Sequence, residues 1–204
     1  MNSMLNRMMD FSSLKIEHVG DKWKDYSDLV DKQISTNKEM SSNKFLPSSG
    51  GTWTGQRGES TWRPNPDGIP KKDNMNNQTW KEILDKYKID GIEYKDGYPD
   101  FSPISVAHVE IDDFSTDRQK NFAQADENLS KKWSEEGKIG KKNWTAQDVR
   151  QYRQENSLTW HEHQDCKTMQ LVPKEIHNNI PHEGGICVKK QQTILARREI
   201  NEYS

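Results

Sequence analysis

The sequence predicts a small α+β domain behind a polar arm, and three observations support this prediction. Hydrophobic residues make up only 30% of the 204 residues, so part of the chain has too few apolar side chains to build a core. Seven Trp, six Tyr and five Phe argue against a wholly disordered protein, because disordered segments are usually poor in aromatics. Short segments with strand and helix periodicity follow the arm. We therefore assign residues 1–47 to a polar arm or linker and 48–204 to the folded domain.

The arm is rich in Asn, Ser, Lys and Met, with a weak amphipathic helix expected at 20–36 and a linker reading SSNKFLPSSGG after it. The first twenty residues lack the apolar stretch of a signal peptide, and no apolar run has the length of a membrane span. We therefore expect any export to use a route other than a classical signal peptide. Cys166 and Cys187 are expected to be free thiols, because two cysteines make a poor secreted scaffold.

The first half of the domain alternates short strands and one helix. GTWTGQRGESTW (51–62) indicates two short strands around a glycine-containing turn. Residues 78–88 place four apolar side chains at helical spacing and predict a helix. The stretch 89–103 is strand and turn material, and SVAHVEI (105–111) alternates well enough to predict a strand.

The second half begins with helices and ends in a hairpin. An apolar stripe predicts a helix from Ser115 to about Glu136, which Gly137 would end. TAQD (145–148) is close to a capping box and predicts the start of a short helix. LTWHEH and TMQLV then predict two strands joined by a turn, and Pro173 favours a helix over about 174–180. The unit at about 158–185 is therefore a ββα hairpin.

Four of the six histidines lie on this hairpin. His161 and His163 share one strand face, His177 is on the predicted helix, and His182 follows the break at Pro181. Neutral imidazoles are common ligands of divalent transition ions, and three protein ligands leave a coordination position open for catalysis. Two other interpretations compete with a metal-assisted nuclease centre: a structural zinc knot, which would want paired cysteines, and ordinary histidines of a small fold.

These residues resemble the WHH branch of the HNH/endonuclease VII superfamily, whose members form C-terminal domains of bacterial polymorphic toxins. The resemblance is carried by Trp160, His161, Glu162, His163, Asp165, Thr168, Met169, Gln170, Val172, Pro173, His177, His182, Glu183, Gly184 and Gly185. GYPDFSP at 97–103 and GTWTGQRGEST also look similar, so the resemblance covers about residues 50–187. One departure is that the branch is named for Trp-His-His, whereas this chain reads Trp-His-Glu-His.

The resemblance implies a ββα-metal, treble-clef-like HNH finger that hydrolyses phosphodiester bonds with one divalent ion, drawn from Zn, Mg, Mn and Ni. It implies DNA as substrate, with RNA as the second candidate, in the cytoplasm of a competing bacterium. It also implies delivery into that cell and a cognate immunity protein in the producer. The alternative function is a non-catalytic or degenerate module that binds nucleic acid or a partner.

The resemblance also implies residue roles, with two registers open on the first strand. In the preferred register His161 is the general base, and Glu162 or His163 assists at the metal. In the other, His161 is a metal ligand and Glu162 takes the base position. His177 and His182 match the ligands at the helix end, and Gln170 matches an amide that orients the base.

Basic side chains near the hairpin are candidates for phosphate contacts. Residues 130–200 hold 13 Lys and Arg against 9 Asp and Glu, within a chain of net charge −2. A mildly basic segment fits contact with a polyanion, and an ordinary solvated surface gives the same count. We predict phosphate contacts at Arg57, Lys167 and Lys174, with Lys189 and Lys190 as further candidates.

Overall fold

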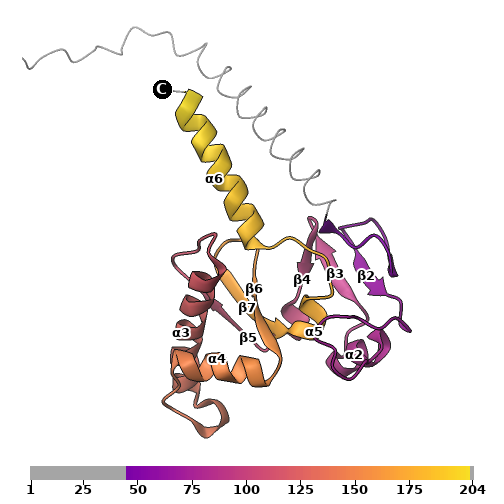
Figure 1. Cartoon of the computed structure of the whole chain (residues 1–204), viewed down its shortest axis with the longest axis horizontal. Helices are drawn as coiled ribbons and strands as arrows, with labels where there is room; N and C mark the ends of the chain where they lie inside the picture. The colour runs from indigo at the N-terminus through magenta and orange to yellow at the C-terminus, as the bar shows by residue number, and fades with distance from the viewer. Residues whose placement is uncertain (1–44, 203–204) are drawn as a thin grey trace, which may run out of the picture. The chain divides into compact units, whose positions relative to one another are not determined.

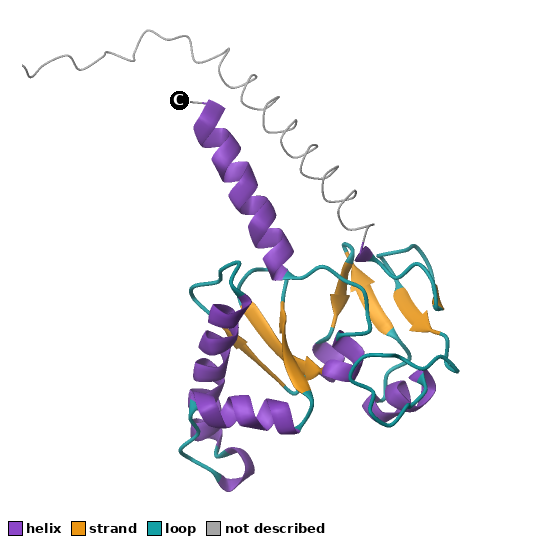
Figure 2. Cartoon of the chain, in the orientation of Figure 1, coloured by secondary structure: helices purple, strands orange, loops and turns teal. Residues whose placement is uncertain are grey.

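The computed structural model describes residues 45–202, and the side chains of residues 45–197. These residues form a mixed α+β domain with helices and two antiparallel sheets, consistent with an HNH nuclease-type fold (Figures 1 and 2). The strands are β1 (Gly51–Trp53), β2 (Thr61–Pro64), β3 (Ile92–Lys95), β4 (Tyr98–Asp100), β5 (Ala107–Glu110), β6 (Leu158–Glu162) and β7 (Thr168–Pro173). The helices are α2 (Trp80–Tyr87), α3 (Arg118–Glu136), α4 (Ala146–Glu155), α5 (Lys174–His177) and α6 (Gly185–Glu202), with 3-10 turns η2 (Ser102–Ile104) and η3 (Lys138–Gly140).

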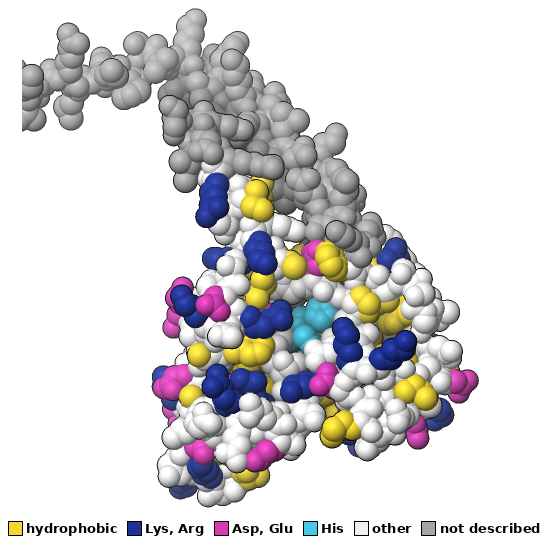
Figure 3. Space-filling view, viewed as in Figure 1, with side chains coloured by type: hydrophobic (Ala, Val, Ile, Leu, Met, Phe, Trp, Pro, Cys, Tyr) yellow, Lys and Arg dark blue, Asp and Glu magenta, His cyan; other side chains and the backbone are white. Residues whose placement is uncertain are grey.

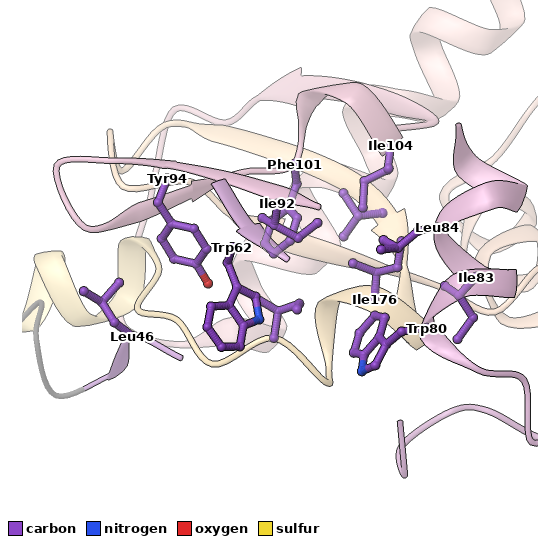
Figure 4. Close-up of a cluster of buried hydrophobic side chains, with 12 residues drawn as sticks. Leu46, Trp62, Trp80, Ile83, Leu84, Ile92, Tyr94, Phe101, Ile104 and Ile176 are labelled. Atoms are coloured by element: carbon purple, nitrogen blue, oxygen red, sulfur yellow. The ribbon is translucent and has the colours of Figure 1, made fainter. Parts of the chain in front are cut away.

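The first sheet has the strand order β1-β2-β3-β4 and packs with α2 around one hydrophobic core (Figure 4). Helix α2 begins with a capping box in which Thr79 and Glu82 satisfy each other's backbone N–H groups. Val172 and Ile176, from the end of β7 and from α5, are fully buried in the same core. The first sheet is thereby attached to the ββα hairpin by apolar packing.

The second sheet has the order β5-β7-β6, so β6 is an edge strand. Helices α3 and α4 cover one of its faces, and a second core forms there around Trp133 and Trp160 (Figure 1). Asp117 caps the start of α3, and Gly137 ends that helix with a left-handed backbone, which glycine adopts without a steric penalty. In the hairpin register His161 lies opposite Gln170, and Glu162 lies opposite Met169.

A buried ion pair ties the second sheet to both of its helices. The Arg153 guanidinium on α4 donates from Nε and Nη2 to the two carboxylate oxygens of Asp126 on α3, at 2.9 and 3.0 Å. The indole Nε1 of Trp160 on β6 donates to the same carboxylate at 2.8 Å. Asp126 is 2% exposed, and these three charge-assisted hydrogen bonds offset the desolvation of its charge. The network therefore fixes β6 against α3 and α4.

Most predicted elements are confirmed, with three differences. The helix predicted over 174–180 is shorter, because α5 ends at His177 and the chain turns before Pro181. Leu46, which we assigned to the polar arm, is 4% exposed and packs in the first core. Helix α6 was not predicted, because its polar composition gives little amphipathic periodicity. Residues 1–44 of the predicted arm, including the helix at 20–36, lie outside the described residues.

Among residues 45–202, no helix combines the length and the apolar composition needed to cross a lipid bilayer.

Candidate metal centre

Three imidazole rings converge at the end of the ββα hairpin. His161 comes from β6, His177 is the last residue of α5, and His182 follows Pro181. The ring centroids lie 5.3 Å apart for His161 and His177, 5.1 Å for His161 and His182, and 4.7 Å for His177 and His182. One ligand nitrogen from each ring lies within 4.8 Å of the other two. Among the described residues, these three histidines are the group that has the composition and spacing to hold a metal ion.

Two glycines allow the segment after His182 to pass close to β6. A β-carbon at Gly184 would lie 2.8 Å from the carbonyl oxygen of Glu162, and one at Gly185 would lie 2.4 Å from that of His163. Both distances are shorter than real contacts allow, so only glycine fits here without a shift of the backbone. This close passage holds His182 near His161.

Phe101 forms an apolar floor under the three rings. It is fully buried just before η2, and its ring centroid lies 4.8 Å from that of His161, 5.5 Å from His177 and 5.2 Å from His182. The sequence indicates only strand and turn structure around Phe101 and a family resemblance there, and nothing in its spacing predicts contact with residues 60 to 81 positions away. The phenyl ring restricts the imidazoles sterically and keeps water from one side of them.

Hydrogen bonds fix which ring nitrogen of His182 carries the proton. His182 Nδ1 lies 2.7 Å from the backbone carbonyl oxygen of Ile180, and a carbonyl can only accept. Nδ1 is therefore the donor, and Nε2 of the neutral ring keeps a lone pair. His177 Nε2 lies 3.3 Å from Nδ1 of His161, and the other nitrogen of His161, Nε2, is buried without a partner among the described residues.

The surroundings of the three rings keep them neutral. Burial, followed by the charges of His182 and His177, lowers the pKa of His161 well below its ordinary value. Burial, followed by the charge of His177, lowers the pKa of His182 to about 3. Burial also lowers the pKa of His177, against a smaller opposing effect of its hydrogen bond to Asn178. Neutral imidazoles have lone pairs available for a cation at physiological pH.

The geometry fits a tetrahedral transition ion. Two imidazole nitrogens bound about 2.0–2.1 Å from a tetrahedral Zn²⁺ lie about 3.3 Å apart. His161 Nδ1 and His177 Nε2 have that separation, at 3.3 Å. Three imidazole nitrogens also match the preference of imidazole for Zn, Fe, Cu or Ni, whereas Mg prefers oxygen ligands.

We call His161, His177 and His182 the trio. Glu162 follows His161 along the chain, but its side chain is on the opposite face of β6. Its carboxylate, 4% exposed, accepts hydrogen bonds from Arg118 Nε at 3.0 Å and from Asn121 Nδ2 at 2.9 Å. Both donors belong to the first turns of α3. Asn121 is itself held by Ser115, whose backbone N–H donates to Asn121 Oδ1 at 2.9 Å. Neither Arg118 nor Asn121 was identified from the sequence, because only the tertiary packing of α3 brings them to β6.

Gln170 and His163 do not join the trio. Gln170 donates from Nε2 to Ser102 Oγ at 3.1 Å, and its buried Oε1 has no partner among the described residues. His163 lies beyond the end of β6, and its Nδ1 is 3.1 Å from a carboxylate oxygen of Asp165 and accepts from the Asp165 backbone N–H at 3.3 Å. The predicted role of His163 as a metal ligand therefore has no support from its position, because its ring is engaged in the β6–β7 turn.

The trio opens into a groove of about 800 Å³, which we call the histidine groove. Its lining includes Ile69, Pro70, Lys71, Lys72, Arg118, Trp160, His161, Glu162, His177, Asn178, Asn179, Ile180, Pro181, His182, Gly184 and Lys190. β6 is an edge strand, and successive residues of it, Trp160, His161 and Glu162, line this groove. In Figure 3 histidine side chains, in cyan, lie in a hollow of this face, with Lys and Arg side chains around it.

The cations of the histidine groove are mostly different from those predicted. Lys190 was a candidate, whereas Lys71, Lys72 and Arg118 were not. Arg57, Lys167 and Lys174 are not part of the groove lining. Arg57 donates to the carbonyl oxygen of Leu46 at 2.9 Å, and Lys167 pairs with Glu110 at 2.7 Å. Their predicted phosphate contacts stay untested predictions.

Residues 91–184 match the family model described as the DNase/tRNase domain of colicin-like bacteriocins, a family of HNH-type nuclease toxins. The match begins at the start of β3 and includes Phe101, Glu162 and all three histidines of the trio. It supports a nuclease toxin function for this part of the chain. No curated protein matches the chain significantly.

Proposed function

We propose that this chain is a metal-dependent endonuclease toxin domain that hydrolyses phosphodiester bonds. The main support for this proposal is that His161, His177 and His182 converge in a groove whose lining includes Lys and Arg. All three lie within the segment that is similar to nuclease toxins. The three neutral imidazoles would hold one divalent ion. When bound, that ion polarises a phosphate oxygen and stabilises the charge that develops on the leaving oxygen.

The position of Glu162 supports the second of the two registers left open by the sequence. His161 is one of the three converging imidazoles, so its ring lies where an ion would be held, whereas Glu162 is outside that group. Glu162 is among the residues that line the same groove, and its carboxylate is oriented by Arg118 and Asn121. Glu162 is then the general base that accepts the proton of the attacking water, and Arg118 holds it in position.

Gln170 has a supporting role in this proposal. It lies opposite His161 in the register of β6 and β7, and its side chain is 7% exposed. Its hydrogen bond to Ser102 Oγ connects β7 to η2, the turn that follows Phe101. Gln170 therefore orients the chain around the trio and does not hold a proton.

The groove favours a polyanion as substrate. Lys71 and Lys72 lie in the loop before α2, whereas Arg118 and Lys190 come from α3 and α6. Cations from separate elements suit phosphates on either side of the bond that is cut, and such contacts position nucleic acid without reading its sequence. We propose DNA as the substrate and RNA as the second candidate.

The biological setting is proposed from the resemblance to the WHH branch and from the match to bacteriocin nuclease domains. The domain acts in the cytoplasm of a competing bacterium after delivery into that cell. A producing bacterium then needs a cognate immunity protein that blocks the histidine groove or a surface beside it.

A cleavage assay with purified protein tests the proposal. Supercoiled plasmid, tRNA and rRNA are incubated with Zn²⁺, Ni²⁺, Mn²⁺ or Mg²⁺, with and without EDTA. We expect the protein to cut nucleic acid and EDTA to abolish the cutting. The variants His161→Ala, His177→Ala and His182→Ala should each lose both cutting and ion binding. His108→Ala is the matched control, because this histidine is exposed on β5 and lies outside the trio. Nucleic-acid binding without cutting in any ion would instead favour the non-catalytic module.

A further inference from the structure

A surface carboxylate is connected to the trio by an asparagine side chain. Asp73 lies in the loop before α2, and its Oδ2 accepts a hydrogen bond from Asn178 Nδ2 at 2.7 Å. The other end of the same amide, Asn178 Oδ1, lies 3.0 Å from His177 Nδ1. Asp73 lies outside the segment that matches the bacteriocin nucleases, so the family similarity does not extend to it.

The carboxylate determines how the amide of Asn178 is oriented. A carboxylate only accepts hydrogen bonds, so the atom of Asn178 that faces Asp73 must be the NH₂ group. The carbonyl oxygen of the amide then faces the ring of His177. Because this oxygen also only accepts, His177 Nδ1 must carry the proton, and the neutral ring keeps its lone pair on Nε2.

We infer that Asp73 is a positioning residue that acts through Asn178 to keep His177 Nε2 free of its proton and ready for an ion. The inference rests on the proposed function, because the lone pair on Nε2 matters only if His177 binds an ion. Nε2 is the nitrogen that points to the trio, 3.3 Å from His161 Nδ1. A hydrogen-bonded partner of this kind also restricts rotation of the ring and raises the basicity of a ligand.

His177 and His182 obtain the same tautomer from different sources. His182 donates from Nδ1 to a backbone carbonyl two residues earlier in the chain, at 2.7 Å. His177 depends on two side chains, one of them about a hundred residues away in the sequence. Substitution of either side chain therefore changes His177 and leaves the support of His182 in place.

The loop that carries Asp73 is attached to α5 independently of the Asn178 contact. Asn179 Nδ2 donates to the carbonyl oxygen of Lys72 at 2.6 Å, and Asn179 Oδ1 accepts from the Lys72 backbone N–H at 2.9 Å. Among the described residues, the Asn179 side chain bonds to Lys72 and Glu175 and not to His177, so its substitution separates two effects. Asn179→Ala loosens the loop, whereas Asn178→Ala removes the contact with the ring.

The backbone at Asp73 guides the choice of variants. Its φ is +52°, a left-handed conformation that glycine and asparagine tolerate and alanine does not. Asp73→Gly removes the acceptor without backbone strain. Asp73→Asn keeps an acceptor oxygen but removes the charge, so it should keep the tautomer and weaken its support only slightly.

The tautomer of His177 is measured first, in the metal-free protein, by the ¹⁵N shifts of its ring at about pH 8, where histidine is neutral. We expect Nδ1–H in the native protein, in Asp73→Asn and in Asn179→Ala. We expect a clear rise of the Nε2–H form in Asn178→Ala and a smaller rise in Asp73→Gly. Retention of pure Nδ1–H in Asn178→Ala would overturn the inference.

Zn²⁺ affinity is measured second, by competition with a chromogenic chelator. Loss of an outer partner of a ligating histidine typically weakens metal binding about 10–100-fold. We expect a loss in that range for Asn178→Ala, about tenfold for Asp73→Gly, and less than about threefold for Asn179→Ala. Equal losses in Asn178→Ala and Asn179→Ala would assign the effect to the loop and overturn the inference. If the native protein binds no divalent ion, the proposed function fails, and the ring shifts still decide whether Asp73 controls the tautomer.

Discussion

The two faces of strand β6 bury polar groups in opposite ways. On the face toward α5, His161 lies among two other imidazoles and Phe101, and its low pKa keeps it uncharged. On the face toward α3, Glu162 is matched by Arg118 and Asn121. Burial of a charge is costly unless it is paired, whereas a neutral ring needs only a hydrogen-bond partner or a ligand. One edge strand thus contributes both an uncharged imidazole and an oriented carboxylate to the residues that line one groove.

The largest expected effect separates the roles of these two faces. Glu162→Gln should lower the cleavage rate about 10²–10⁴-fold, because an amide cannot accept the proton of water as a carboxylate does. Binding of Zn²⁺ should be unchanged, since Glu162 is not in the trio. Single-turnover cleavage and metal titration measure the two quantities.

The matched control for this experiment is Glu93→Gln, at an exposed position on β3 outside the groove. It should cut at the native rate. A Glu162→Gln variant that cuts at the native rate, or one that loses its ion, would assign Glu162 a different role.

The next effect concerns the ion pair on the α3 side of the sheet. Asp126→Asn leaves the Arg153 guanidinium buried without its counter-charge and should lower the free energy of unfolding by about 3–5 kcal/mol. Chemical denaturation followed by tryptophan fluorescence measures this loss. Glu127→Gln breaks an exposed pair with Lys131 on the same helix and should cost less than about 1 kcal/mol. Similar losses in both variants would contradict a special contribution of the buried pair.

The trio should make the metal-free protein sensitive to acid. The pKa of His182 is lowered to about 3 in the folded state, so the unfolded chain takes up its proton first as the pH falls. This histidine thus lowers the free energy of unfolding progressively below about pH 6.5, by on the order of a few kcal/mol near pH 3. Denaturation in EDTA across this range, compared with His182→Gln, isolates the contribution. A variant with the same pH dependence as the native protein would show that His182 titrates normally.

The smallest effect distinguishes groove cations from other surface cations. Lys72→Gln should weaken nucleic-acid binding a few-fold and reduce the slope of log affinity against log salt by about 1, as expected for the loss of one phosphate contact. Lys167→Gln should leave the slope unchanged, because Lys167 is paired with Glu110 outside the groove. Fluorescence anisotropy with a labelled duplex at several salt concentrations measures both. The reverse result would favour the phosphate contact predicted from sequence.

The hairpin could be predicted because its signals are local. Alternating side chains, Pro173 and Pro181 define two strands and a short helix within about 25 residues. The convergence of His161, His177 and His182 follows from that unit, and the distances confirm it. Their ligand role stays a prediction.

The surroundings of the trio could not be predicted, because they come from distant parts of the chain. Phe101, Arg118 and Asp73 lie 44 to 105 residues from the groups that they contact. No periodicity within one segment reports such contacts. Strand alternation did place His161 and Glu162 on opposite faces, but only the edge position of β6 explains how both reach one groove.

The carbonyl oxygen that supports His182 belongs to the main chain of Ile180. Every amino acid carries that atom. A substitution at position 180 therefore keeps the hydrogen bond to His182 as long as the new side chain still packs in the core. The support of His177 comes from the side chains of Asp73 and Asn178, so a substitution of either one removes it. Divergent copies of this domain are therefore expected to lose or replace the support of the helix-end ligand first, and to adjust their ion affinity there.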